Sequence, residues 1–202
     1  MPPFFDRLIV QDTNMAAQIE MLRVLHVGCG PANPKKLPQL FRSADWQEIR
    51  LDIDPAVAPD ILGTMTDMAE VADGSMDALY SSHNVEHLYA HEVPLAFAEF
   101  FRVLKPGGFA VVTCPDLQSL GQLLAEGKLE DQAYVSPAGP ITPLDILYGL
   151  RTAVARGNHF MAHKTGYTNQ TLGHKLVQAG FGPVRVSKGQ CFDLWARADK
   201  PS

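Results

Sequence analysis

The apolar residues of this chain gather in short runs, and these runs alternate with stretches in which apolar residues recur at helical spacing. The runs predict strands, which we place at 22–28, 46–55, 60–62, 77–82 and 109–114. Helices are predicted at 13–21, 91–104, 117–127 and 169–179. Strands that alternate with helical segments indicate an α/β fold with a mainly parallel sheet.

The clearest helix spans 91–104 and ends at "KPGG", where Gly107 suits the left-handed conformation of a helix cap. Its apolar residues recur at helical spacing and are expected to face the sheet. They are Val93, Phe97, Phe100, Phe101 and Leu104. A shorter, weaker helix is predicted within 33–44, where Pro38 interrupts it.

The regular alternation breaks over residues 115–166, which we interpret as an insertion or lid within a single domain spanning 1–202. Thr168 is the predicted N-cap of the helix at 169–179. The tail that follows contains two strand-like runs joined by "SKGQ". A connection this short predicts an antiparallel hairpin.

Composition narrows the class of protein. The chain has 17 Lys and Arg against 22 Asp and Glu, a net charge of −5, which argues against broad nucleic-acid binding. No apolar stretch approaches the roughly 20 residues that a membrane helix needs, and the N-terminal residues lack the pattern of a signal peptide. Cys29, Cys114 and Cys191 have no disulfide or zinc spacing, so we expect a cytoplasmic protein. The sequence gives no indication of oligomeric state.

The stretch "VLHVGCGPANP", residues 24–34, joins a predicted strand to a glycine turn with Gly28 and Gly30. Asp52 closes the next predicted strand, where a carboxylate can accept hydrogen bonds from ribose hydroxyls. Glycine turns at the carboxyl ends of parallel strands allow a ligand to approach the backbone. Together these features predict a cofactor that contains adenosine.

A nicotinamide dinucleotide fits this loop poorly. Asn33 stands where the dinucleotide fingerprint has glycine or alanine. Pro31 and Pro34 remove amide donors that would hold a pyrophosphate. A cofactor without phosphates is therefore favoured, and a nicotinamide-dependent oxidoreductase remains the less favoured alternative.

Five motifs carry a family resemblance: "VLHVGCG", "RLDIDP", "DGSMDALYSSHNVEHL", "FRVLKPGGFAVVTCPDL" and "HKTGYTNQTLGHKLVQAGF". Their order resembles that of class I S-adenosylmethionine-dependent methyltransferases, and especially a compact subgroup with "EHL" and "LKPGG" motifs. The resemblance covers about residues 22–196. It implies a Rossmann-like, mostly parallel seven-stranded sheet with a C-terminal antiparallel hairpin, and S-adenosyl-L-methionine as the cofactor.

The resemblance also implies a cofactor site. Gly28 and Gly30 would pass close to the methionine moiety, Asp52 would bind the ribose and Ile53 would flank the adenine. Asp67 and Met68 resemble the pair near the adenine amine, although Thr64 competes for the position of the acid. The full set of implied cofactor-binding residues is His26, Gly28, Cys29, Gly30, Asp52, Ile53, Asp67, Met68, Ser82 and His83.

Two positions depart from the family pattern. His26 stands where the family often has an acid that orients the glycine loop, and Ala32 replaces the third glycine. These departures keep open a second interpretation, a module that binds S-adenosylmethionine without catalysing transfer.

The predicted reaction is transfer of a methyl group to an oxygen or nitrogen of a small-molecule or glycan-like acceptor. His83, which follows the strand at 77–82, is the first candidate for a general base, and His163 and Asp116 are reserves. Glu86 and His87 are interpreted as bracing a turn. His159 and His163 have the spacing of a zinc helix but lack a clear third ligand, so no metal is predicted.

Overall fold

The computed structural model describes residues 21–202. The helix predicted at 13–21 lies outside these residues, apart from Met21. None of the helices in the described part of the chain has both the length and the apolar character needed to cross a membrane.

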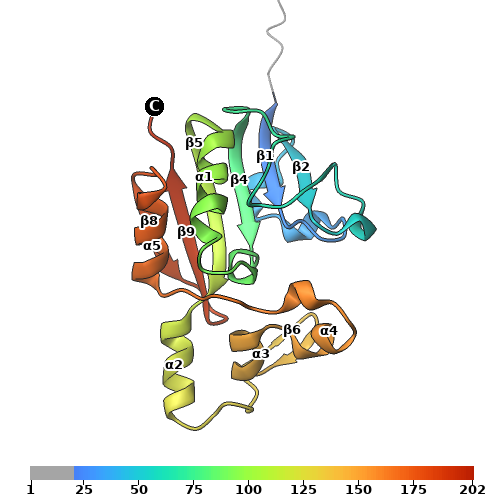
Figure 1. The fold of residues 1–202 in the computed structure, drawn as a ribbon, viewed down its shortest axis with the longest axis vertical. Helices are drawn as coiled ribbons and strands as arrows, with labels where there is room; N and C mark the ends of the chain where they lie inside the picture. Colours follow the sequence, from blue (N-terminus) through green and yellow to red (C-terminus); the bar gives the residue numbers. More distant parts are fainter. Residues whose placement is uncertain (1–20) are drawn as a thin grey trace, which may run out of the picture.

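Seven strands form one sheet in the order β3-β2-β1-β4-β5-β9-β8 (Figure 1). Their bounds are β1 (Leu22–Val27), β2 (Trp46–Asp52), β3 (Ile61–Leu62), β4 (Met76–Ser82), β5 (Leu104–Pro115), β8 (Val184–Lys188) and β9 (Asp193–Asp199). The first five run parallel, whereas β9 pairs antiparallel with both β5 and β8. The predicted fold class is confirmed, including the terminal hairpin.

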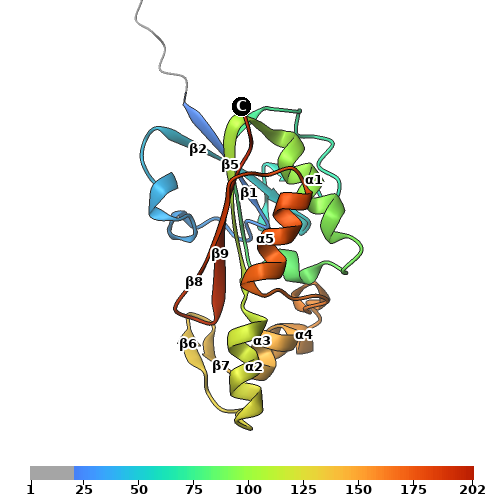
Figure 2. The same ribbon diagram turned by 90° about the vertical axis from the view of Figure 1, so that its left-hand side faces the viewer.

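Helices α1 (Val93–Val103) and α5 (Asn169–Gln178) cover one face of this sheet (Figure 2). The main apolar core lies between them and the strands. Phe97 and Phe100 of α1 are fully buried there, as the helical spacing predicts. Leu104 is also buried but begins β5, because its backbone is extended at φ −75° and ψ 140°. Gly107, predicted as a helix cap, lies within this strand at φ +77°.

The opposite face carries no α-helix between β1 and β3 in the described residues. Short 3₁₀ turns take its place, at Pro34–Lys36, Gln39–Phe41 and Pro55–Val57. The weak helix predicted at 33–44 is therefore replaced by two turns, because Pro38 interrupts helical hydrogen bonding between them. Phe41 covers the sheet here, packing against Trp46 and near Tyr80.

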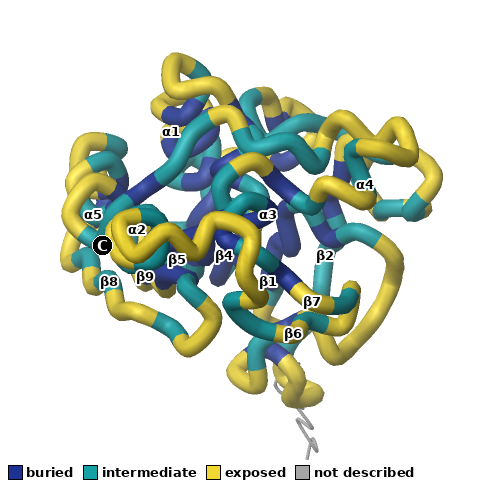
Figure 3. Tube along the Cα trace, turned by 90° about the horizontal axis from the view of Figure 1, so that it is seen from below, coloured by how far each residue is buried: buried dark blue, intermediate teal, exposed yellow. Residues whose placement is uncertain are grey.

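Residues 115–166 lie beyond the carboxyl ends of the parallel strands (Figure 1), and we refer to them as the subdomain. Its elements are α2 (Leu117–Ala125), β6 (Tyr134–Ser136), β7 (Gly139–Ile141), α3 (Pro143–Tyr148), α4 (Arg151–Ala155) and the 3₁₀ turn His159–Met161. A separate apolar cluster around Leu120, Ile141 and Ile146 holds it together. Figure 3 shows these elements lying across the end of the buried sheet.

Candidate functional site

A cavity of about 480 Å³ opens at the carboxyl ends of β1, β2 and β4. Its walls come from the glycine loop, the end of β2, residues 63–66, the turn after β4 and residues 158–164 of the subdomain. Open α/β sheets bind ligands at this edge, where their strand order reverses. The volume lies within the range of small-molecule and cofactor sites.

The glycine loop packs tightly beneath the turn that follows β4. Gly28 and Gly30 both have positive φ, +67° and +58°. A Cβ atom on Gly28 would lie 2.2 Å from Oδ1 of Asn84, whose Nδ2 donates a hydrogen bond of 2.9 Å to the carbonyl of Val27. Glycine is therefore required at position 28 by both backbone conformation and space.

Asp52 organises the same loop from the end of β2. Its carboxylate is buried, and it accepts hydrogen bonds from the backbone N–H groups of Gly30, at 2.7 Å, and Asp54, at 2.9 Å. Both Asp52 and the adjacent Ile53 line the cavity, and Ile53 is 49% exposed. The strand end thus presents a carboxylate beside an open apolar surface.

Two of the residues predicted to contact the cofactor, His26 and Cys29, do not line the cavity. His26 lies on the opposite face of the sheet, with Nδ1 2.6 Å from Oε1 of Glu48 and its ring against Tyr80. Burial lowers the pKa of His26, although Glu48 opposes this effect. Cys29 is buried within the loop, and neither residue lines the cavity. Strand alternation explains the position of His26, because its neighbours Leu25 and Val27 point to the other face.

Arg50 is a residue of this loop that the sequence did not single out. Its Nη2 atom donates hydrogen bonds to the carbonyls of Gly30, at 2.6 Å, and Val57, at 3.0 Å, and its Nη1 atom donates to Ala58, at 2.7 Å. Arg50 therefore ties the glycine loop to the turn after β2. In the sequence, Arg50 is one polar residue of a strand in which apolar and polar residues alternate. Nothing in that pattern indicates that its side chain contacts the glycine loop.

Asp67 and Met68, also predicted to contact the cofactor, lie away from the cavity. Asp67 is exposed, Met68 is buried in the main core, and neither lines the cavity. Thr64, Met65 and Thr66 line it instead. The turn that pairs Thr64 with Asp67 directs the earlier residues inward, so Thr64, the competing residue in the sequence, occupies the cavity wall.

A second cavity, of about 170 Å³, adjoins the first and lies between the turn after β4 and the subdomain. His83, His87 and Met161 line both cavities. His83 follows β4 with φ +53° and donates its backbone N–H to the carbonyl of Thr113. Its side chain is 47% exposed, so the ring is available at the junction of the two cavities.

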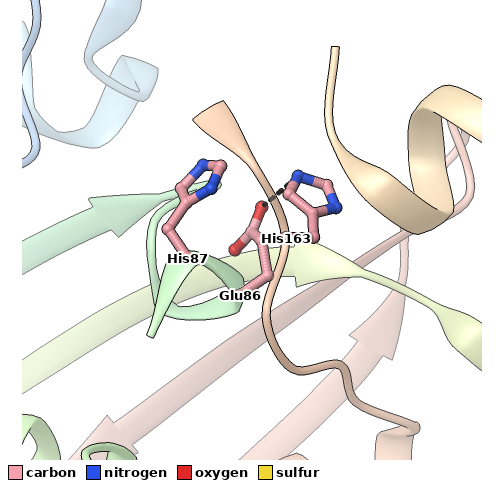
Figure 4. Close-up of side chains that lie close together, drawn as sticks. All are labelled: Glu86, His87 and His163. Carbon is pink, nitrogen blue, oxygen red and sulfur yellow. Dashed lines mark ion pairs between the residues drawn. The ribbon is translucent and has the colours of Figure 1, made fainter. Parts of the chain in front are cut away.

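The carboxylate of Glu86 lies beneath this junction among three histidines. Nδ1 of His83 is 3.4 Å and Nε2 of His163 is 3.9 Å from Oε1 of Glu86. Figure 4 shows His87 and His163 on either side of Glu86. Burial opposes ionisation of Glu86, but the three histidines outweigh it and lower its pKa. Glu86 is fully buried, and neither oxygen has a hydrogen-bond partner among residues 21–202.

Burial and the charge of Glu86 also shift the pKa values of His83 and His163, in opposite directions. Burial disfavours protonation of His83, but Glu86 outweighs it and raises the pKa of that ring. Burial dominates at His163 and lowers its pKa. His159 is exposed and does not join the cluster.

The sequence of this chain is similar to those of known proteins. Residues 25–112, from β1 into β5, match the family model of a methyltransferase domain. The chain is 25% identical over 190 residues to malonyl-[acyl-carrier protein] O-methyltransferase of Serratia marcescens, covering 87% of this chain and 69% of that enzyme. The chain carries a class I S-adenosylmethionine-dependent methyltransferase domain.

Solved structures share the fold at low sequence identity. A methyltransferase from Archaeoglobus fulgidus superposes with a TM-score of 0.59 at 17% identity, covering 89% of this chain and 86% of that one. The 1,6-didemethyltoxoflavin-N1-methyltransferase of Burkholderia thailandensis, solved with S-adenosylhomocysteine, has a TM-score of 0.57 at 12% identity, covering 91% of this chain and 72% of that one.

The cavity fits the cofactor of this methyltransferase domain. It offers the buried carboxylate of Asp52 at the end of β2, the exposed apolar side chain of Ile53 beside it, and the backbone of Gly28 and Gly30 in its wall. Ala32, which replaces the third family glycine, is exposed and does not have positive φ. The loop therefore keeps its shape without that glycine.

Asp116, a predicted reserve base, has a structural place in the methyltransferase domain. It is buried, lines neither cavity and is the N-cap of α2. Its carboxylate accepts hydrogen bonds from Gln118 N and Ser119 Oγ, and Nζ of Lys188 is 3.4 Å away. This geometry gives Asp116 the role of a helix cap.

Asp116→Ala is expected to lower the free energy of unfolding by about 1–2 kcal/mol, because α2 loses its cap. Urea denaturation measures this change. The exposed Asp131→Ala is the matched control and should change stability by less than about 0.5 kcal/mol. Affinity for S-adenosylhomocysteine should stay the same in both variants. A loss of cofactor affinity in Asp116→Ala would contradict the structural role.

Proposed function

We propose that this domain transfers the methyl group of S-adenosylmethionine to an oxygen or nitrogen of a small-molecule acceptor bound in the second cavity. The observation that carries the proposal is the junction of the two cavities, where His83, His87 and Met161 belong to both walls. A cofactor held in the larger cavity and an acceptor held in the smaller one would meet at these side chains.

Residues of the larger cavity would bind the cofactor. Asp52 would accept hydrogen bonds from the ribose hydroxyls, and the backbone of Gly28 and Gly30 would lie against the methionine moiety. Ile53 and Met65 would flank the adenine, with Thr64 near its amine. When bound, S-adenosylmethionine supplies an activated methyl group on a sulfonium centre. The chain supplies orientation, which can contribute on the order of 7–11 kcal/mol to catalysis.

His83 is the proposed general base. Its backbone is fixed by the hydrogen bond to Thr113, and its exposed ring stands at the cavity junction. There it can accept the proton that the acceptor loses as the new bond to carbon forms. His163 lines the smaller cavity, but its Nδ1 is engaged with the carbonyl of Ile146, so it would shape the pocket.

The second cavity supports a small acceptor. Its walls include Tyr134, Ile141, Leu150 and Phe192, and the rings of Tyr134 and Phe192 are stacked with centroids 6.5 Å apart. Such walls suit a compact planar or sugar ring. The names of the similar proteins describe methylation at oxygen in one and at nitrogen in the other, in agreement with either acceptor atom.

The alternative of a module that binds the cofactor without catalysis rested on His26 and Ala32. His26 hydrogen-bonds to Glu48 behind the loop, so the neighbouring strand supplies a carboxylate close to the family position. Neither His26 nor Ala32 lines either cavity, so these two departures from the family pattern leave the cavity walls unchanged. The shared junction favours the catalytic proposal.

Asp52→Asn tests the cofactor site. The amide keeps one acceptor oxygen but directs an NH₂ group at a backbone N–H and removes the negative charge. Hydrogen bonds to charged groups contribute about 1.5–3 kcal/mol, so affinity for S-adenosylhomocysteine should fall roughly ten- to hundredfold in calorimetric titration. Asp131→Asn is the control. Unchanged affinity in Asp52→Asn would remove Asp52 from the site.

The transfer itself is tested by incubating the chain and S-adenosylmethionine labelled in the methyl group with a panel of small hydroxyl- and amine-bearing compounds. Label should enter at least one small compound, and less so when unlabelled S-adenosylhomocysteine is added. Saturable cofactor binding with no transfer to any member of a broad panel would favour the module without catalysis.

A further inference from the structure

We infer that Glu86, His87 and His163 form a binding site for one divalent first-row transition-metal ion at the junction of the two cavities. The sequence predicted no metal, and none of the comparisons assigns one to these residues. Glu86 and His87 come from the turn after β4, whereas His163 comes from the end of the subdomain (Figure 4).

The donor atoms are already gathered. One carboxylate oxygen and one ring nitrogen from each histidine lie within 4.8 Å of one another, and Nε2 of His163 is 3.9 Å from Oε1 of Glu86. Ligands at about 2.1 Å from a shared ion lie roughly 3.0–3.5 Å apart. Small rotations of the side chains would therefore close the site without moving the backbone.

Both histidines are oriented as metal ligands are. Nδ1 of His87 lies 3.1 Å from the carbonyl of Ala162, and Nδ1 of His163 lies 2.9 Å from the carbonyl of Ile146. A carbonyl can only accept, so these hydrogen bonds place the proton on Nδ1 and leave a lone pair on Nε2. Metal-ligating histidines typically use their second nitrogen in this way.

The Glu86 carboxylate is only loosely paired among the described residues, since its nearest histidine nitrogen is Nδ1 of His83 at 3.4 Å. It is fully buried, and neither oxygen accepts a hydrogen bond. Burying an unpaired carboxylate is costly, and buried charges are ordinarily paired or bound to metals. A carboxylate this deeply buried that accepts no hydrogen bond is an independent indication that a cation binds beside Glu86.

Backbone contacts hold the two parts of the site together. The carbonyl of Glu86 accepts hydrogen bonds from the N–H groups of Lys164, at 2.8 Å, and Thr165, at 3.1 Å. Tyr167 adds a hydrogen bond from its hydroxyl to the carbonyl of Val85. The segment bearing His163 is thereby fixed to the turn bearing Glu86 and His87, so the backbone of the site is held in place and only side-chain rotations are needed to bind an ion.

The donor set selects the class of ion. Two imidazole nitrogens and one carboxylate oxygen suit Zn²⁺, Mn²⁺, Fe²⁺ or Co²⁺, whereas Mg²⁺ and Ca²⁺ prefer oxygen ligands alone. Three protein ligands also leave a coordination position open. All three residues line the smaller cavity, so that position would face a bound acceptor. This role in acceptor binding rests on the proposed function, whereas binding of the ion does not.

The test measures metal binding directly. The full chain is stripped with a chelator, dialysed against Zn²⁺ or Co²⁺, and its metal content determined. We expect one ion per chain and a visible Co²⁺ absorption band. His87→Gln and His163→Gln should each weaken binding at least about tenfold and reduce the band, since each removes a direct ligand, and losing even an outer-shell partner costs 10–100-fold. His174→Gln, an exposed residue on α5, is the matched control.

Glu86→Gln separates a metal ligand from a structural carboxylate. The variant removes a buried charge that accepts no hydrogen bond, so the metal-free chain should melt at the same temperature or higher. The stabilisation by Zn²⁺ that we expect in the wild type should be lost. Absence of stoichiometric binding, or equal binding by the three glutamine-for-histidine variants, would overturn the inference. Titration of the same samples with S-adenosylhomocysteine distinguishes the two proposals, because cofactor binding without metal binding would refute only the metal site.

Discussion

Gly28→Ala is expected to weaken binding of S-adenosylhomocysteine by roughly a hundredfold or more, equivalent to about 2.7 kcal/mol. Two physical effects combine at this position. A side chain at φ +67° costs about 1–2 kcal/mol, and its Cβ would lie 2.2 Å from the Asn84 side chain. Asn84 must then move and give up its hydrogen bond to Val27, so the loop changes shape where the cofactor would lie.

Gly127→Ala is the control for Gly28→Ala, because it introduces the backbone strain without the steric clash. Gly127 also has positive φ, +75°, but no atom lies within 4 Å of the position that a Cβ would take. It should lose about 1–2 kcal/mol of folding stability and no cofactor affinity. Calorimetric titration and urea denaturation measure the two quantities. Equal cofactor affinity in Gly28→Ala and the wild type would show that the loop does not contact the cofactor.

His83→Asn should lower turnover about 10²- to 10⁴-fold, because a general base accelerates the reaction by about this factor. Cofactor affinity should stay within about twofold of the wild type, because a general base acts on the rate and not on cofactor binding. Asparagine is chosen because residue 83 has φ +53°, a conformation that asparagine tolerates better than alanine. The backbone is thereby kept while the base is removed. Turnover is measured with an acceptor found by the labelled-methyl screen.

The exposed His91→Asn is the matched control, since His91 lies outside both cavities. It should keep full turnover. If His83→Asn also keeps its turnover, the base is another group or the acceptor needs none. If cofactor affinity falls with turnover, His83 acts in binding and its role as a base is refuted.

Much of the fold was predictable because it follows from local patterns. Apolar runs placed β1, β2 and β4, and helical spacing placed α1 and α5 close to their observed bounds. Thr168 caps α5 as predicted. The short link between β8 and β9 required an antiparallel pair. The prolines that prevented a helix after β1 were visible, but the two 3₁₀ turns that replaced it were not predicted.

The candidate site was predictable only in part. The sequence by itself determined the fold class, the glycine turn and the carboxylate at the end of β2, because chain order and strand polarity bring the ends of parallel strands to one edge. It could not decide which face His26 occupies, which residues of the turn after β3 point inward, or that Asp116 caps a helix. Only the tertiary structure brought His163 to Glu86 and His87, because long-range packing and backbone hydrogen bonds, not local sequence, set that contact.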